Sequence, residues 1–243
     1  MFFMSIPVYS VPVYADFYQQ QVQPVIARGT DQASLKIFLA GTMATLVARP
    51  NDDSIREQWV DHQKMDKDAA RFGDLLGTGL PGLGIAFSQY FFFDQQGGIN
   101  HLRALISTDL VTQSMKLAFG RNRPGTSHSH KSFPSGHTST AFASATALSM
   151  TYGWKAAVIA YPLAAWTGAS RLADDAHWFS DIVAGAFVGV WWARASVFPP
   201  EVNQETNQEV NQKANSARNQ ASAWNWCPIV TSQYLGANFD IRF

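Results

Sequence analysis

The sequence predicts an all-α protein, a helical bundle of about six core helices with a small C-terminal β-hairpin. Residues 74–195 contain no Asn-Gly or Asp-Gly turn and are rich in alanine, with glycine and proline near Gly97-Gly98 and Arg123-Pro124-Gly125. This pattern is typical of consecutive helices. At the C-terminus, apolar and polar residues alternate from Leu235 to Phe243, the period of a half-buried strand, whose partner we expect around Trp226–Val230.

Composition narrows the class of protein. The 243 residues carry 18 basic and 18 acidic side chains, and this balance speaks against a nucleic-acid partner. Hydrophobic residues make up 47% and charged residues 15%, against roughly 25% charged in soluble domains. The chain is therefore not disordered as a whole. Cys227 is the single cysteine, which excludes an intrachain disulfide framework and a multi-cysteine metal site.

Changes in composition along the chain divide it into four regions. We predict an N-terminal region with amphipathic helices over 1–72, a helical core over 73–198, a low-complexity linker over 199–223 and the β-hairpin over 224–243. Because two strands cannot close a barrel, the hairpin is expected to lie against the helices, another copy or a membrane interface.

Three segments of the N-terminal region differ in character. Met1–Ala15 is apolar, but its prolines and the lack of a preceding basic stretch make it a poor signal peptide, unless the true start lies upstream. Leu35–Val47 predicts a first core helix, in which Met43 would be buried. Asn51–Arg71 mixes both charges with few apolar residues and predicts an amphipathic surface segment.

Whether a membrane surrounds the bundle is left open by hydropathy. The mean hydropathy of −0.10 is low for a polytopic protein, yet three charge-free windows approach the roughly 20 residues of a membrane span. These windows are Leu75–Phe93, Ser132–Trp154 and Ala156–Ser170. Each contains proline, glycine or hydroxyl residues or is short, so we predict helices that are buried in the protein or embedded in a membrane. Trp191-Trp192 fits a membrane-interface belt and core packing equally well.

Three clusters place cations, histidines, a serine and a carboxylate at fixed offsets among apolar residues. In the first, Lys116 and Arg123 are seven residues apart and would share a helix face before Pro124 ends the helix. In the second, Phe133-Pro134-Ser135-Gly136-His137-Thr138, a helix would begin whose free N–H groups point at an anion. In the third, Ser170-Arg171 precedes His177 and Asp181, which would share a helix face four residues apart.

Together these groups match the needs of phosphate-ester cleavage. The transition state carries charge on three equatorial oxygens and requires several donors, an in-line nucleophile and an acid for the leaving alcohol. Lys116, Arg123 and Arg171 would supply the cations, and Ser135 with the Gly136 N–H would add neutral donors. Two histidines remain for the proton-dependent steps, one oriented by Asp181 and free to attack, the other beside the turn to protonate the leaving oxygen.

The order and spacing of these residues resemble the signature of the type 2 phosphatidic-acid phosphatase superfamily, which includes bacterial non-specific acid phosphatases and vanadium-dependent haloperoxidases. Every signature position is present: Lys116, Arg123, Pro124, Pro134, Ser135, Gly136, His137, Ser170, Arg171, His177 and Asp181. The signature covers residues 116–181 directly and leaves both ends of the chain unexplained.

The resemblance implies a role for each matching residue. His177 would attack phosphorus and form a phosphohistidine, Asp181 would orient it, and His137 would act as the general acid. The phosphate would be bound by Lys116, Arg123, Ser135, Gly136 and Arg171, and no metal or other cofactor is implied. His128-Ser-His130 also suggests a metal pair, but no third ligand stands at suitable spacing. We expect a polar loop there and a solvated loop at Asp174-Asp175.

We therefore expect a metal-independent phosphatase whose partner is a phosphorylated lipid, of the phosphatidic-acid or prenyl-pyrophosphate type, or a small phosphoester. It would be membrane-associated with its site on the extracytoplasmic, periplasmic side. The alternatives are a soluble periplasmic acid phosphatase acting on nucleotides or sugar phosphates, a vanadate-dependent haloperoxidase and a non-catalytic lipid-binding protein. The sequence leaves the oligomeric state open.

Overall fold

The computed structural model describes residues 17–125, 128–198, 228–231 and 234–237. The apolar N-terminal segment and the low-complexity linker lie outside these residues, as does Trp226. Of the hairpin, β1 (Pro228–Thr231) and β2 (Tyr234–Ala237) are described, and they pair antiparallel with Val230 opposite Leu235. The predicted helical bundle is therefore confirmed. The two described strands pair as expected, whereas residues 238–243 of the predicted strand lie outside the described residues.

The first half of the described chain consists of short helices before and after one longer helix, α3 (Gln32–Ala48). A π-helical turn, η1 (Tyr18–Val22), leads into α2 (Gln23–Gly29). Asp31 caps the next helix because its carboxylate accepts a hydrogen bond from the Ser34 N–H at 2.7 Å. The elements that follow are α3 (Gln32–Ala48), η2 (Arg49–Asn51), α4 (Asp52–Val60), α5 (Lys67–Gly77), α6 (Leu80–Ser88) and η3 (Gln89–Phe93).

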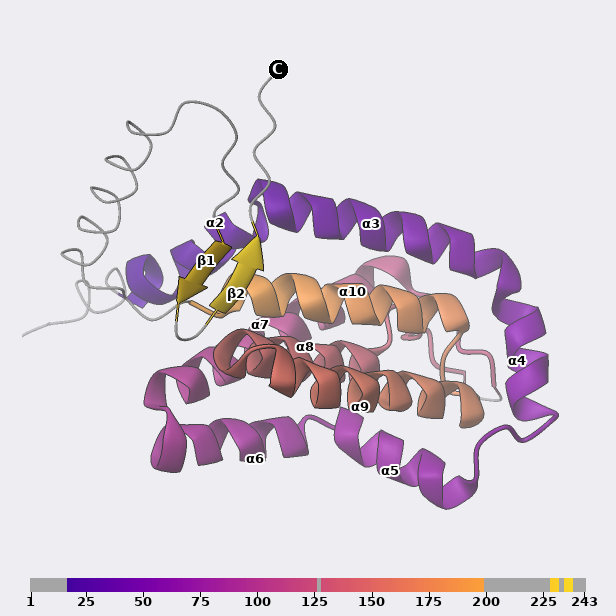
Figure 1. Cartoon of the computed structure of the whole chain (residues 1–243). Helices are drawn as coiled ribbons and strands as arrows, with labels where there is room; N and C mark the ends of the chain where they lie inside the picture. Colours follow the sequence, from indigo (N-terminus) through magenta and orange to yellow (C-terminus); the bar gives the residue numbers. More distant parts are fainter. Residues whose placement is uncertain (1–16, 126–127, 199–227, 232–233, 238–243) are drawn as a thin grey trace, which may run out of the picture.

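Four long helices form the body of the bundle: α7 (Gln95–Phe119), α8 (Gly136–Tyr152), α9 (Trp154–Ala173) and α10 (Phe179–Ser196). Helix α8 packs against the other three, α3 runs alongside α10, and α5 packs against α9 (Figure 1). Helix α4 turns away from the end of α3 and covers one end of the bundle (Figure 1).

The helices approach closely because small residues line their contacts. A Cβ at Gly189 of α10 would lie 2.4 Å from the Ser139 carbonyl oxygen of α8, and one at Gly98 of α7 would lie 2.5 Å from the Tyr90 nitrogen. The largest group of buried apolar residues is alanine, and many buried polar residues are serine or threonine. Close backbone packing therefore replaces the large apolar core usual in water-soluble domains.

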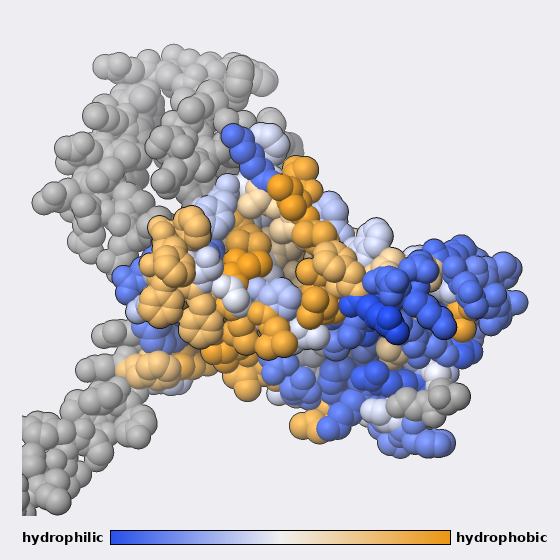
Figure 2. All heavy atoms as spheres, turned by 90° about the horizontal axis from the view of Figure 1, so that it is seen from below, coloured by the Kyte–Doolittle hydropathy of each residue, from blue (hydrophilic) through white to orange (hydrophobic). Residues whose placement is uncertain are grey.

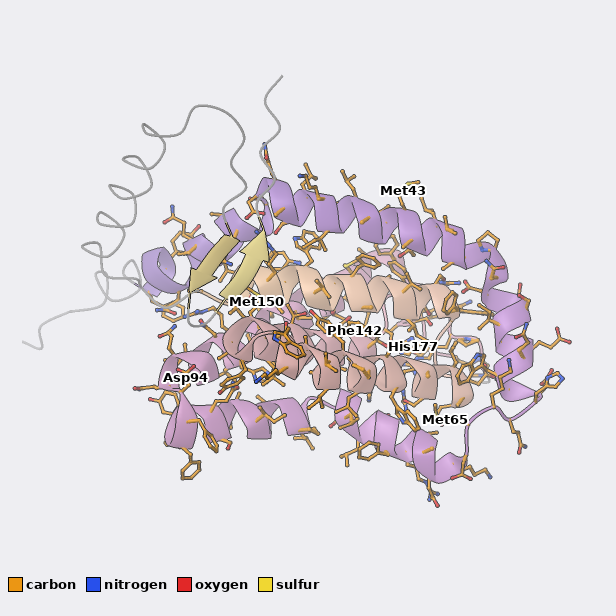
Figure 3. The ribbon with its side chains drawn as sticks, viewed as in Figure 1. Met43, Met65, Asp94, Phe142, Met150 and His177 are labelled. Atoms are coloured by element: carbon orange, nitrogen blue, oxygen red, sulfur yellow. The ribbon has the colours of Figure 1, made fainter. Side chains whose placement is uncertain are left out.

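Large apolar side chains point outward instead, which corrects two predictions. Leu35–Val47 was expected to be a core helix, but Met43 is 62% exposed and projects from the outer side of α3 (Figure 3). Leu75–Phe93 was expected to be buried in the protein or embedded in a membrane, and burial in the protein is wrong for Phe92 and Phe93, which are 78% and 79% exposed. These helices turn glycine and alanine toward their neighbours, so their bulky residues have no protein surface left to cover.

Some of the outward apolar residues are gathered on one face of the molecule. Figure 2 shows them gathered over one part of the lower face, whereas hydrophilic residues cover the end at which α4 lies. Within the part of the chain that the structure describes, no helix combines the length and hydropathy needed to cross a bilayer.

Candidate active site

The predicted anion-binding turn is the start of α8. Ser135 is the N-cap, and its hydroxyl accepts a hydrogen bond from the Thr138 hydroxyl at 2.9 Å. The Ser135 N–H donates to the Asp181 carbonyl at 3.0 Å, which ties the turn to α10. Gly136 and His137 are the first residues of the helix, where N–H groups have no intrahelical acceptor. The turn therefore presents donors and the positive end of a helix dipole to an anion.

Lys116 lies beneath this turn, near the end of α7. Its ammonium donates to the Pro134 carbonyl at 2.6 Å and to the Lys131 carbonyl at 2.9 Å. A Cβ added at Gly136 would lie 3.6 Å from Cε of Lys116, so the two residues are neighbours. Burial, aided by the charge of Arg123, lowers the pKa of Lys116 to about 8. An incoming anion would favour its charged form.

Arg123 belongs to the same cluster, but it lies in a loop and not on the helix as predicted. Helix α7 ends at Phe119, and Gly120 follows with φ 55°, a left-handed helix end. Arg123 is therefore in the loop after the helix, and the predicted shared helix face with Lys116 is wrong. The charge of Arg123 still lowers the pKa of Lys116, His137 and His177. Its buried Nε has no hydrogen-bond partner within the described residues.

His177 and Asp181 are adjacent as predicted, but they do not lie on the same helix. Helix α10 begins at Phe179 with Trp178 as its N-cap, so His177 is in the preceding loop and the predicted shared helix face is wrong. The Asp181 carboxylate accepts a hydrogen bond from the Trp178 N–H at 3.1 Å. This cap turns the loop back over the helix, so Nδ1 of His177 lies 3.6 Å from the carboxylate. Nδ1 is also 3.5 Å from the Ser132 hydroxyl.

The Asp181 carboxylate is buried yet held ionised. Burial favours its neutral form, but hydrogen bonds from His177 and Ser132 and the charge of Arg121 outweigh burial and lower the pKa of Asp181. The Ser132 hydroxyl donates to it at 2.5 Å and the Arg121 guanidinium at 2.6 Å. Burial lowers the pKa of His177 to about 4. At neutral pH the imidazole is uncharged, and with acceptors facing Nδ1 its other nitrogen, Nε2, carries the lone pair.

Arg171 and His137 meet at a carboxylate that the sequence had not indicated. Asp74 of α5 lies 2.5 Å from the Arg171 guanidinium and 3.1 Å from Nε2 of His137. Arg171 also pairs with Asp174 at 2.6 Å. Burial, together with the charge of Arg171, lowers the pKa of His137, while Asp74 acts in the opposite direction. Asp74 is half exposed, so it stands at the open side of the cluster.

The structure thus brings the predicted residues to one end of the bundle, where His177 lies towards α4 (Figure 3). Sequence reasoning missed several residues that hold them. Arg121 lies between Lys116 and Arg123 but was not distinguished from a helix-surface cation. Asp74 could have been noticed as a carboxylate bordering a charge-free window. Two more residues, Ser132 and Asp52, had no signal in the sequence.

The loops flanking the site also differ from expectation. Asp174 and Asp175 were expected to be solvated, but Asp174 pairs with Arg171, and Asp175 accepts two hydrogen bonds at 2.6 Å from Arg56 of α4. Within the described residues, no group of three or more His, Cys, Asp or Glu side chains is arranged to hold a metal ion.

An apolar groove of about 430 Å³ adjoins the site between α3, α7 and α10. Its lining includes Phe38 and Thr42 of α3, Met115 of α7 and Trp191 of α10. Arg121 and Ser180 also line it, so the groove reaches the residues that hold Asp181. A chain of methylene groups fits such a lining better than a polar ligand does.

The fold and this cluster define a class: a helical bundle with cations and histidines gathered at one end. Residues 97–200, from the first turn of α7 to just beyond α10, match the family model of the PAP2 superfamily. This match confirms the predicted resemblance.

Two curated relatives support this assignment. A lipid A 1-phosphatase of Porphyromonas gingivalis is 45% identical over 78 residues, which cover 31% of this chain and 17% of that protein. Lipid phosphate phosphatase 1 of Arabidopsis thaliana is 31% identical over 129 residues, covering 36% of this chain and 39% of that protein. The chain therefore spans less than half the length of these relatives.

Two crystal structures share the fold. LpxE of Aquifex aeolicus aligns with a TM-score of 0.51 and 22% identity, covering 57% of this chain and 90% of that one. The first transmembrane PAP2 type phosphatidylglycerolphosphate phosphatase from Bacillus subtilis aligns with a TM-score of 0.54 and 19% identity, covering 72% and 96%. At these identities the likeness shows the fold alone.

Proposed function

We propose that this protein is a metal-independent phosphatase that hydrolyses phosphate monoesters or pyrophosphates of lipids through a phosphohistidine. The observation that carries the proposal is the convergence of three cations, Lys116, Arg123 and Arg171, with the start of α8 around two histidines of different surroundings. His177 is buried, neutral and backed by Asp181, as a nucleophile requires. His137 is half-buried beside the cations, where a phosphate would favour its protonated form.

The reaction needs two steps. Nε2 of His177 attacks phosphorus, the bond from phosphorus to the leaving oxygen breaks, and His137 gives that oxygen its proton. In the second step a water molecule gives a proton to His137 and attacks the phosphohistidine. The phosphorus–nitrogen bond then breaks, releasing phosphate and restoring neutral His177. Throughout both steps the three cations and the α8 N–H groups would hold the equatorial oxygens.

A lipid substrate is supported by the apolar surface and the groove. Arg121 and Ser180, which are next to Asp181, line the groove, and α3, which supplies several of its lining residues, also carries exposed apolar residues such as Leu39 and Met43. An acyl or prenyl chain bound there would find an apolar lining close to the phosphate site. The relatives point to the same class, since they include a lipid A 1-phosphatase and a lipid phosphate phosphatase.

The decisive experiment is phosphate release in the presence of EDTA. The panel compares lipid A, phosphatidic acid and prenyl pyrophosphate with a nucleotide monophosphate and p-nitrophenyl phosphate. We expect preference for the lipids, retention of activity in EDTA, and loss of turnover in the folded His177→Ala variant. Equal turnover of the soluble esters would instead assign the chain to the acid phosphatases. Activity that survives His177→Ala would refute the phosphohistidine.

We further propose that the protein is membrane-associated with its site on the extracytoplasmic side. The exposed aromatic run Tyr90–Phe93 and the outer face of α3 supply an apolar surface that lipid would cover. Carbonate extraction of membranes tests the association, and hydrolysis of a membrane-impermeant ester by intact spheroplasts tests the side. Release of the protein into the carbonate supernatant would argue against membrane association.

A further inference from the structure

Helix α4 contacts both ends of the loop that carries His177. The loop runs from Asp174, at the end of α9, to the first residues of α10. Asp52 and Arg56 are four residues apart and therefore share one face of α4. Each makes its ion pair with a residue outside its own helix. The segment containing them had been expected to be an amphipathic surface segment.

Asp52 contacts both Ser180, just after the loop, and Arg121, which in turn contacts Asp181. Its carboxylate accepts hydrogen bonds from the Ser180 N–H at 2.8 Å and the Ser180 hydroxyl at 2.7 Å. The same carboxylate pairs with Arg121 at 2.7 Å, while the other Nη of Arg121 donates to Asp181 at 2.6 Å. Asp52 is buried, with 5% of its surface exposed. A continuous chain of charge-assisted hydrogen bonds therefore runs from α4 to the carboxylate beside His177.

Arg56 holds the near end of the loop. Its guanidinium donates two hydrogen bonds of 2.6 Å to the Asp175 carboxylate, in the forked geometry that fixes orientation. The Asp175 backbone has φ 52°, a left-handed conformation that a non-glycine residue adopts at a cost. The Arg56 pair supplies an interaction that holds this conformation in place.

We propose that α4 is a clamp on the His177 loop, with Asp52 and Arg56 as positioning residues. By fixing Asp175 and Ser180 on either side of His177, and Asp181 through Arg121, they would keep the imidazole aligned for attack on phosphorus. Both residues lie outside the matched span of residues 97–200, so the clamp belongs to this chain's N-terminal region. The effect of the clamp on catalysis rests on the proposed phosphatase function. Its effect on the position of the loop does not.

The first test is amide hydrogen exchange of the full chain in detergent. Asp52→Asn and Arg56→Gln should speed exchange at residues 174–180 at least tenfold, while the middle of α8 stays unchanged. Asp53→Asn and Glu57→Gln are the controls, because each neutralises a charged residue one position along, on the exposed side of α4, and they should leave the loop unchanged. Unchanged exchange in both clamp variants would overturn the clamp, whatever the activity.

The second test is kinetic and uses phosphate as a competitive inhibitor. Asp52→Asn should lower kcat at least tenfold while KM and the inhibition constant of inorganic phosphate stay within twofold, since the phosphate-binding cations are untouched. Arg56→Lys, which keeps the charge but loses the fork, should lie between wild type and Arg56→Gln. Faster loop exchange with an unchanged kcat would overturn the positioning role. A wild-type chain inactive on the whole panel would defeat the proposed function, and the exchange experiment would still decide the clamp.

Discussion

The carboxylate of Asp74 lies 3.1 Å from Nε2 of His137 and opposes the groups that lower the pKa of that imidazole. Burial and the charges of Arg171, Arg123 and Lys116 lower this pKa, and only Asp74 raises it. The open side of the cluster thus carries a carboxylate that favours the acid form of His137.

Replacing this carboxylate should move the pH–rate profile. Since a general acid is active only while protonated, Asp74→Asn should shift the alkaline limb of kcat/KM to lower pH by about one unit. Asp68→Asn, on the same helix but exposed and away from the site, serves as the control. An alkaline limb that stays in place would mean that Asp74 does not face His137 during turnover.

Ser132 should contribute to turnover through Asp181. Its hydroxyl donates to the Asp181 carboxylate at 2.5 Å, and a hydrogen bond to a charged group is worth about 1.5 kcal/mol or more. Ser132→Ala should therefore lower kcat roughly tenfold with little change in KM. Ser149→Ala, which removes a hydroxyl bonded only within α8, should be neutral. Steady-state kinetics on the best lipid substrate would detect the difference, and equal kcat values in the two variants would contradict the role.

Stability should fall as the solution is acidified. Burial lowers the pKa of both His101 and His177 to about 4 from 6.5. Between these values the unfolded chain binds protons that the folded chain does not, so the free energy of unfolding decreases as the pH falls from about 6.5 towards 4. His101 pairs with Gln89 at 2.8 Å, outside the site. The decrease between pH 7.5 and 5 should be smaller in His101→Gln, measured by denaturant unfolding; an identical decrease would show that His101 titrates normally.

The contact between α8 and α10 should not tolerate a methyl group. A Cβ at Gly189 would lie 2.4 Å from the Ser139 carbonyl oxygen and 2.9 Å from the Ala143 nitrogen. These are backbone atoms, so Gly189→Ala should cost about 1–3 kcal/mol of folding free energy. At Gly84 of α6 a Cβ would meet nothing within 4 Å, so Gly84→Ala should stabilise by about 0.5–1 kcal/mol. Thermal unfolding of the pair provides the comparison, and equal midpoints would contradict the close approach.

The groove should set the preference for chain length. Thr42 lines it from α3, and a tryptophan there would fill much of the space. Thr42→Trp should lower kcat/KM for long-chain phosphatidic acid at least tenfold more than for the short-chain form. Leu39→Trp, on the outer side of α3 and absent from the groove lining, should change neither. An equal loss for both chain lengths would indicate that the acyl chain lies elsewhere.

Much of the site was predictable because phosphate chemistry demands residue types in a fixed chain order. Lys116, Ser135, His137 and Arg171 could be selected before any coordinates, and so could the bundle that carries them. Two local predictions were wrong, although the structure does bring the residues concerned together. Arg123 and His177 lie in loops, because Gly120 ends α7 and the Asp181 cap delays the start of α10. The periodicity of apolar residues does not show where a side chain such as Asp181 caps a helix and so sets its first residue.

What the sequence by itself determined was local: helix-forming segments, the order of the cationic and histidine clusters, and the alternation of the C-terminal strand. Only the tertiary structure decided which faces are buried. Glycine, alanine and serine fill the contacts here, so the usual inference that large apolar residues lie inside was wrong for α3 and α6. The tertiary structure also decided the partners of Asp52, Arg56 and Asp74. These residues pair with residues distant in the chain, and such pairing depends on how whole helices pack and not on the spacing of residues in the sequence.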